Sequence, residues 1–225
     1  MTRVRQAAGG GRVVEVSSDR VSGWLMRFGE RHGGLTVKDM SPTAVAVIGG
    51  DGALATLEVP FAPMDLGQYE PVEALLEHMA SLGDLAAIVV RERAFSVGIC
   101  RSGKVLVSST DTRYVQSRTA AGGWSQQRYA RRRDNQRRDS YRAAADRANR
   151  VFAEHVGAFA GIIAAGDRTA IDTVLSDPRF KHLAALPRRS FVDVGEPRRA
   201  VLDEVAERAM TVEITIRDAD ATSGK

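Results

Sequence analysis

The chain has 225 residues, of which 44% are hydrophobic and 27% charged, a composition typical of a globular protein with one sizeable core. A single cysteine excludes an intrachain disulfide and a metal site built from several thiolates. No apolar run approaches membrane-spanning length, and the basic N-terminus is not followed by the apolar stretch of a secretion signal. We therefore expect a cytoplasmic protein with no membrane partner.

The first third of the chain predicts short strands and two helices. A loose Gly-rich lead-in is expected over residues 1–11, and apolar runs on either side of Gly49-Gly50-Asp51-Gly52 predict a hairpin. Trp24 falls on the buried face of the first helix. The predicted strands are 12–16, 35–39, 43–48 and 53–59, and the predicted helices are 19–31 and 71–82.

The middle of the chain predicts the centre of a sheet followed by a long helix. Strands are expected at 86–90, 94–100 and 104–108, and a polar loop at about 111–124. Residues 125–165 lack proline and contain glycine only at 157 and 161, which predicts one long helix or two nearly continuous ones. Within it Phe152, Val156, Phe159 and Ile163 recur at helical spacing and are expected to pack on the sheet.

The remaining elements complete an alternating pattern of helices and strands. We expect helices at 167–175 and 197–208, strands near 190–194 and at 211–217, and a disordered tail at 218–225. The pattern predicts an α/β (α+β) fold: one domain over residues 12–217, with a single mixed β-sheet flanked by helices.

Two glycine-containing segments, Gly49–Gly52 between two strands and Gly98–Lys104, invite a nucleotide-binding interpretation but lack the required context. The stretch from Gly98 to Lys104 matches the start of a phosphate-binding loop, yet Val105 stands where a Ser or Thr would hold Mg²⁺, and strand-like residues follow. We expect a hairpin turn there, and Cys100 as a buried thiol in a strand.

Acidic residues at strand ends leave a second chemistry open. Six carboxylates lie near predicted strand ends, where a sheet could gather them around two metal ions for nuclease chemistry. Nothing in the sequence brings three of them together, so solvated side chains are expected instead, and no metal or other cofactor is predicted. The six are Glu15, Asp39, Glu58, Glu92, Asp111 and Asp193.

The most informative segment is a glycine pair that leads into an arginine-rich helix. Gly122 and Gly123 lack Cβ atoms, so the backbone can approach a partner closely. Residues 128–150 contain nine arginines and three aspartates, an excess of six positive charges in a chain whose total is +4. This clustering favours a nucleic-acid-binding face over a merely solvated one, and Trp124 beside the glycines could stack on a base or ribose.

The residues from Gly122 to Arg133 resemble the signature loop and helix start in the middle domain of eukaryotic and archaeal class-I peptide release factors, where Gly-Gly-Gln-Ser precedes Arg-Phe/Tyr-Ala-Arg. The segment is more similar still to the Vms-like release factors, the peptidyl-tRNA hydrolases of ribosome quality control, and especially to their compact actinobacterial branch. The resemblance implies an RNase-H-like, release-factor middle-domain fold with a long basic helix after the glycine loop. Trp124 stands where the release factors have glutamine.

The resemblance implies a release of nascent chains from stalled ribosomes, with ribosomal RNA of the peptidyl-transferase centre and peptidyl-tRNA as partners. The catalytic role passes to Gln126, with Gln127 as the alternative, and Gly122 and Gly123 would supply backbone N–H groups. If Ser125 caps the helix, Gln126 lies in its first turn. We expect a monomer. The residues expected to contact RNA are Trp124, Ser125, Arg128, Arg131, Arg132, Arg133, Arg137 and Arg138.

Two other functions remain open from the sequence. In the first, the displaced glutamine has lost hydrolysis and the protein is a non-catalytic ribosome-binding or hibernation factor. In the second, it is a metal-dependent nuclease on an RNase-H-like sheet.

Overall fold

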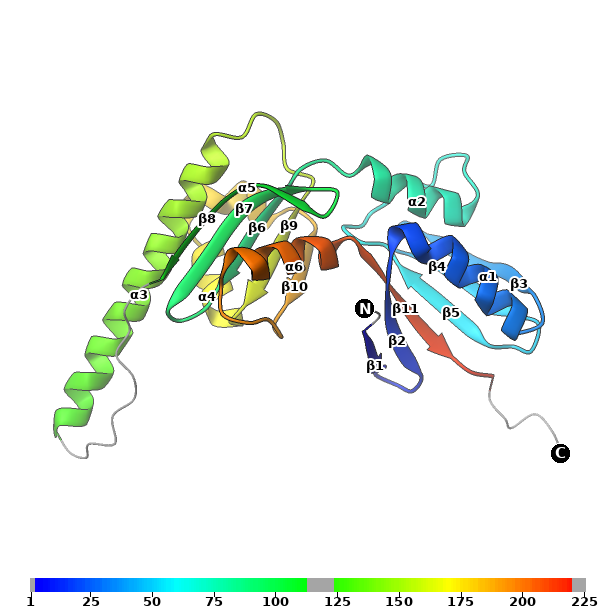
Figure 1. The fold of residues 1–225 in the computed structure, drawn as a ribbon, viewed down its shortest axis with the longest axis horizontal. Coiled ribbons are helices and arrows are strands. Elements are labelled where there is room, and N and C mark those ends of the chain that lie inside the picture. The colour runs from blue at the N-terminus through cyan, green and yellow to red at the C-terminus, as the bar shows by residue number, and fades with distance from the viewer. Residues whose placement is uncertain (1–2, 113–123, 220–225) are drawn as a thin grey trace. The chain divides into compact units, whose positions relative to one another are not determined.

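The computed structural model describes residues 3–112 and 124–219, with the backbone alone at 124–126 and 129. Contacts between residues divide the chain into two compact units: the first contains the described residues up to Leu82 together with those from Met210 onward, and the second contains residues Gly83–Ala209 (Figure 1). The sequence predicts one domain over residues 12–217. Composition gives no sign of a division, because no linker rich in Gly, Pro or Ser marks either boundary, Leu82/Gly83 or Ala209/Met210.

The first unit is a six-stranded sheet with two helices packed against one face. Every neighbouring pair of strands is antiparallel, in the order β1-β2-β11-β5-β4-β3. Alternate residues of the strands form one buried cluster with residues of both helices. The elements are β1 Val4–Gln6, β2 Arg12–Ser17, α1 Val21–Arg31 after a 3₁₀ turn at Ser18–Arg20, β3 Leu35–Ser41, β4 Ala44–Gly49, β5 Leu54–Glu58, α2 Pro71–Ser81 and β11 Thr211–Arg217.

Strand β1 lies in the stretch that the sequence predicts as a loose lead-in. Val4 pairs with Val14 and Gln6 with Arg12, so this short strand extends the edge of the sheet. The reversal between β1 and β2 uses Gly9, Gly10 and Gly11, which all have positive φ. Glycines that looked like flexible sequence are therefore those of a turn.

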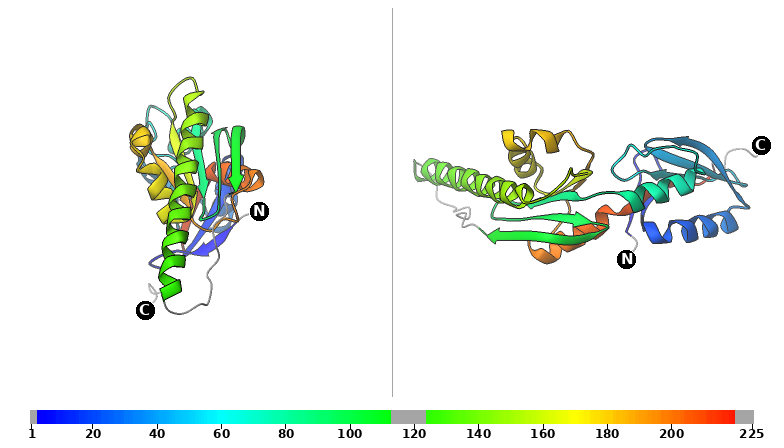
Figure 2. Two further views of the ribbon diagram at one scale, coloured as in Figure 1. Left: turned by 90° about the vertical axis from the view of Figure 1, so that its left-hand side faces the viewer. Right: turned by 90° about the horizontal axis from the view of Figure 1, so that it is seen from above.

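The second unit is a mixed five-stranded sheet in the order β10-β9-β6-β7-β8. Strand β9 runs parallel to both β10 and β6, whereas β6, β7 and β8 are antiparallel. Helices α3 and α4 cover one face of the sheet and α6 covers the other (Figure 2). The elements are β6 Leu85–Val90, β7 Ala94–Arg101, β8 Lys104–Thr112, α3 Trp124–Ala153, β9 Gly161–Gly166, α4 Arg168–Leu175, a 3₁₀ turn at Pro178–Phe180, α5 Lys181–Ala184, β10 Arg188–Phe191 and α6 Arg199–Ala209.

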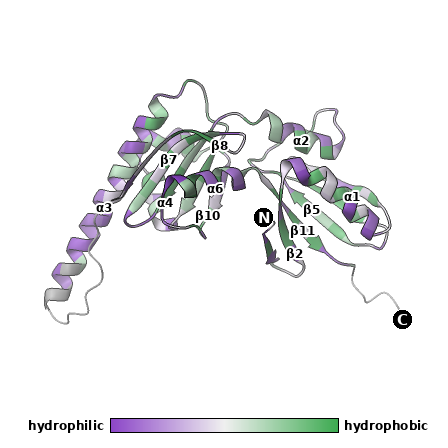
Figure 3. Ribbon diagram, in the orientation of Figure 1, coloured by the Kyte–Doolittle hydropathy of each residue, from purple (hydrophilic) through white to green (hydrophobic). Residues whose placement is uncertain are grey.

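The centre of the second sheet is buried on both faces. All residues of β6 and β9 are buried, because helices lie above and below them. These strands are coloured as hydrophobic in Figure 3, whereas α3 is mainly hydrophilic. Gly98 in β7 permits close packing, since a Cβ there would come within 2.5 Å of the Val107 carbonyl oxygen and 3.0 Å of Leu202 Cδ2 in α6.

The prediction of helix through residue 165 is wrong in its last part. Helix α3 ends at Ala153, and residues 161–166 form β9. Ile163 is fully buried as a strand residue, while Val156 lies in the connecting loop with 96% of its surface exposed. Of the four apolar residues, only Phe152 belongs to α3. Their helical spacing therefore arose by chance and did not indicate one continuous helix.

The predicted fold class is confirmed as mixed α+β, with a long basic helix following the glycine loop. The single predicted sheet is instead two sheets. The hairpins at Gly49–Gly52 and at Ser102-Gly103 are confirmed, so neither glycine segment leads into a helix. Strand β10 spans Arg188–Phe191, so it begins and ends earlier than the strand predicted near residues 190–194.

Candidate functional site

The site predicted from sequence centres on the first turns of α3. Gly122 and Gly123 lie outside the described residues. Helix α3 begins at Trp124, so the backbone of Ser125 and Gln126 is already helical and Ser125 is not the residue before the helix. Gln127 and Arg128 are exposed. The backbone of Gln126 therefore lies in the first turn of α3, the location where helix N–H groups have no partner within the helix.

The structure separates the six predicted RNA-contacting arginines into two groups. A helix turns about 100° per residue, which puts residues 128, 131, 132 and 138 on one side and residues 133 and 137 on the opposite side. Exposure agrees with this geometry: the first four arginines are exposed, while the other two are half-buried. We call Arg128, Arg131, Arg132 and Arg138 the outer arginine face of α3.

Arg137 is held by acidic neighbours. Its guanidinium donates to Asp134 one turn earlier, and its Nε lies 3.9 Å from Glu92 Oε1 in the turn between β6 and β7. Part of its charge is therefore neutralised within the protein. Among the described residues, no ion pair holds an arginine of the outer face, so the charge of this face is more available to a polyanion than that of Arg137.

The second half of α3 packs on the sheet. From Ser140 onward its buried side chains follow a helical stripe, with Ala144 and Ala148 fully buried. Alanines allow the helix to approach the strands closely, and Arg147 Nη1 donates to Ser109 Oγ of β8 at 2.9 Å. The packed half thus fixes the direction in which the arginine-rich half extends.

A buried acidic residue holds the segment that follows α3. Asp84, 6% exposed, accepts two hydrogen bonds from Arg101, at 2.5 Å from Nε and 2.9 Å from Nη2, and lies 3.5 Å from His155 Nδ1. The hydrogen bonds from Arg101 lower the pKa of Asp84, and the charges of Arg101 and His155 act in the same direction. No local sequence pattern reveals this cluster, because its three members come from distant segments.

Cys100 is a buried structural thiol, as predicted. It is fully inaccessible, and burial, together with the charge of Asp203, raises the pKa of its thiol to about 12. The thiolate required for reactivity is therefore scarce at neutral pH.

The strand-end carboxylates are not gathered into a site. Among residues 3–112 and 124–219, no three His, Cys, Asp or Glu side chains lie close enough together to hold a metal ion. In the same described part of the chain, no helix is both long and apolar enough to cross a membrane.

Comparison with solved structures finds similar chains at low identity. They include an archaeal translation termination factor, aRF1 (14% identity, TM-score 0.42, 72% of this chain and 51% of that chain), the Vms1 mitochondrial localization core (11%, 0.44, 88% and 83%) and Archaeoglobus fulgidus Pelota (13%, 0.35, 93% and 66%). This chain thus spans about half the length of the termination factor. No curated protein matches the sequence.

The family comparison covers the unit that carries α3. Residues 83–215 match the model of a family described as the Actinobacteria/chloroflexi VLRF1 release factor, and they include the glycine pair, the outer arginine face and the whole five-stranded sheet. The match spans more than half of the chain and confirms the resemblance to Vms-like release factors. The chain belongs to the Actinobacteria/chloroflexi VLRF1 release factor family.

Proposed function

We propose that the protein is a ribosome-associated peptidyl-tRNA hydrolase that releases nascent chains from stalled ribosomes. The observation that carries the proposal is the outer arginine face, which starts at Arg128 on a helix that begins directly after a glycine pair, within the part of the chain that matches a release factor family. Membership of such a family supports action on the ribosome. The proposed partners are ribosomal RNA of the peptidyl-transferase centre and the peptidyl-tRNA.

The arginines would provide placement. Guanidinium groups contact phosphates without reading sequence, and the wide, shallow minor groove of RNA helices offers further backbone contacts. Arg128, Arg131, Arg132 and Arg138 are exposed together along one side of about 15 Å of helix, at ~1.5 Å per residue. We assign the RNA contact chiefly to this face, with Arg133 and Arg137 contributing less because they lie on the side that continues into the packed stripe.

The chemical step would be hydrolysis of the ester between the peptide and the terminal ribose of tRNA. A water oxygen bonds to the carbonyl carbon, the bond from that carbon to the ribose oxygen breaks, and the ribose oxygen takes up a proton. We assign Gln126 to orient the water through its side-chain amide, with Gln127 as the alternative. Backbone N–H groups at Gly122 and Gly123, and the positive end of the α3 dipole, would stabilise the developing oxyanion.

Peptide release from stalled ribosomal complexes tests this proposal. Complexes carrying labelled peptidyl-tRNA are mixed with wild-type protein and with Gln126→Ala, Gln127→Ala and Gly123→Ala. Gln68→Ala serves as the matched control, because Gln68 is an exposed amide of the first unit, which does not carry α3. We expect Gln126→Ala to slow release by roughly 10²- to 10³-fold, the usual cost of one such polar group, and Gln68→Ala to leave the rate unchanged.

The products distinguish the open alternatives. Hydrolysis yields a peptide with a free carboxyl end and an intact tRNA, whereas nuclease action leaves nucleotides attached to the peptide. Binding of wild-type protein without release would refute the hydrolase and support the non-catalytic ribosome factor. Full activity in both glutamine variants would refute the assigned mechanism.

A further inference from the structure

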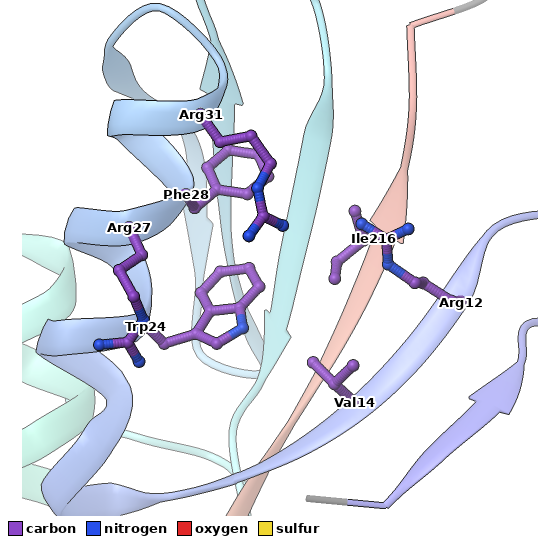
Figure 4. Close-up of a pocket in the computed structure, with 7 residues that line it drawn as sticks. All are labelled: Arg12, Val14, Trp24, Arg27, Phe28, Arg31 and Ile216. Carbon is purple, nitrogen blue, oxygen red and sulfur yellow. The ribbon is translucent and has the colours of Figure 1, made fainter.

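A basic pocket lies in the first unit, between α1 and the face of the six-stranded sheet. It has a volume of about 340 Å³ and is shown in Figure 4. All of its lining residues fall outside residues 83–215, the part that matches the release factor family. They are Arg12, Val14, Trp24, Arg27, Phe28, Arg31 and Ile216.

The helical spacing of α1 and the two-residue repeat of strand β2 bring the lining residues together. Trp24, Arg27, Phe28 and Arg31 stand at i, i+3, i+4 and i+7 and share one side of α1. Arg12 and Val14 are two residues apart in β2 and so point to one face, and Ile216 of β11 pairs directly with Arg12. The helical pattern predicts Trp24 as a core residue, but it gives no sign that the arginines on the same side of the helix line a pocket.

The floor of the pocket is apolar and its wall is aromatic. Val14, Phe28 and Ile216 are at most 6% exposed. The indole of Trp24 stacks on Phe28, with centroids 5.3 Å apart and an interplanar angle of 18°, but Trp24 itself is only half-buried. The remainder of this fixed ring is therefore available to a flat ligand.

The rim of the pocket carries three arginines whose positive charges are not paired with acidic side chains in the described part of the chain. No ion pair or hydrogen bond joins Arg12, Arg27 or Arg31 to a side chain within the described ranges 3–112 and 124–219, and no acidic residue lines the pocket. In Figure 4 the guanidinium of Arg31 extends toward Trp24, and that of Arg12 lies beside Ile216. Grouped positive charges with no partner repel one another, and a bound anion would remove that repulsion.

We propose that this pocket binds a single-stranded RNA segment, with one base against Trp24 and the adjoining phosphates on Arg12, Arg27 and Arg31. A stacking platform beside guanidinium groups is the combination that proteins use for unpaired nucleotides, since every base has a flat face and every linkage a charge. Duplex RNA keeps its bases stacked inside and cannot present one to Trp24. An acidic peptide would satisfy the charges, but the pocket opens on a sheet face and offers no strand edge to the peptide backbone.

The test follows the fluorescence of Trp24 directly. In the full chain with Trp124→Phe, Trp24 is the single tryptophan, so its emission reports this pocket alone. A single-stranded RNA 12-mer is titrated into this protein, in parallel with a blunt duplex of the same length and with a free mononucleotide. We expect saturable quenching by the single strand at concentrations at least roughly tenfold lower than for either competitor.

Arginine pairs provide the matched comparison. Arg27→Ala/Arg31→Ala removes two charges from the rim, and Arg20→Ala/Arg217→Ala removes two exposed charges of the same unit that do not line the pocket. We expect the first pair to raise the half-saturating concentration at least roughly tenfold and to lower the slope of log affinity against log salt by about 1.4, at ~0.7 per phosphate contact. The control pair should change the half-saturating concentration by less than about twofold.

Three results would overturn the proposal: unchanged Trp24 emission, equal effects of the two arginine pairs, or equal affinity for single strand and duplex. The pocket proposal and the proposed function can fail separately, because the pocket and the release site lie in different units. A variant that loses binding at the pocket is therefore expected to keep its rate of peptide release.

Discussion

The two halves of α3 differ in what they contribute. Residues 140–153 carry the buried stripe that holds the helix on the five-stranded sheet, whereas Gln127–Asp139 contains no fully buried side chain among those described. One helix thus combines a half that stabilises the fold with a half whose outer face is exposed and, in the proposed function, binds RNA. Predictions about α3 must therefore depend on the half in which a residue lies.

The largest difference is expected for the same substitution in each half. Ala148→Asp places a charge at a fully buried position, and we expect it to lower the free energy of unfolding by about 4 kcal/mol. Ala130→Asp, at a half-exposed position, should cost less than about 1 kcal/mol. Urea unfolding of both variants measures the difference, and equal losses would show that the arginine-rich half is also packed.

For ribosome binding, in contrast to stability, substitutions should have the larger effect in the arginine-rich half of α3. We expect Arg131→Ala/Arg132→Ala to weaken binding to ribosomes roughly tenfold, because phosphate contacts are lost, without changing the urea midpoint. The control Arg142→Ala/Arg150→Ala removes two exposed arginines from the packed half and should change binding by less than about threefold. A larger effect in the control pair would transfer the RNA contact to the other half.

Asp84 holds the segment that follows the packed half, and its contribution should depend on pH. Since the folded-state pKa is lowered from 3.8, the stabilisation is complete above that value and is lost as pH falls through the lowered pKa. We expect Asp84→Asn to cost about 1 to 2 kcal/mol at pH 7, because Arg101 is 60% exposed and partly screened. Unfolding from pH 7 to pH 2.5 should show the wild-type advantage shrinking below about pH 4, and a pH-independent gap would exclude this role.

The smallest effect is expected for two neighbouring arginines. Arg138→Ala on the outer arginine face should weaken ribosome binding by about threefold. Arg137→Ala should weaken it less, since Asp134 and Glu92 already neutralise part of that charge. Side-by-side titrations at one salt concentration would settle the order, and the reverse ranking would mean that the half-buried side of the helix faces RNA.

Local patterns predicted most of the elements. Periodicity and turn residues placed the hairpin glycines, the strands β6, β7 and β8 and the final strand 211–217, because each depends on near neighbours in the sequence. The missed β9 shows the limit. A short apolar run such as Ile162-Ile163-Ala164-Ala165 is buried equally well in a helix or a central strand, and only its position between β6 and β10 decides.

The candidate site was predictable in composition but not in geometry. The sequence revealed the arginines of α3, yet their division into an outer face and a sheet side follows from where the helix meets the strands. The Asp84 cluster and the basic pocket arise from segments distant in sequence, namely residues 84, 101 and 155 in one case and residues 12, 24–31 and 216 in the other. No local signal pairs such segments.

A probe that cleaves nearby RNA tests most directly which half of α3 meets the ribosome. Iron chelates would be tethered to Asn135→Cys and, about 22 Å away at ~1.5 Å per residue, to Arg150→Cys; both positions are exposed, and buried Cys100 should not react. We predict cleavage of ribosomal RNA around the peptidyl-transferase centre from position 135 and much weaker cleavage from position 150. Cleavage there from position 150 alone, or from neither, would contradict the proposed role of the arginine-rich half.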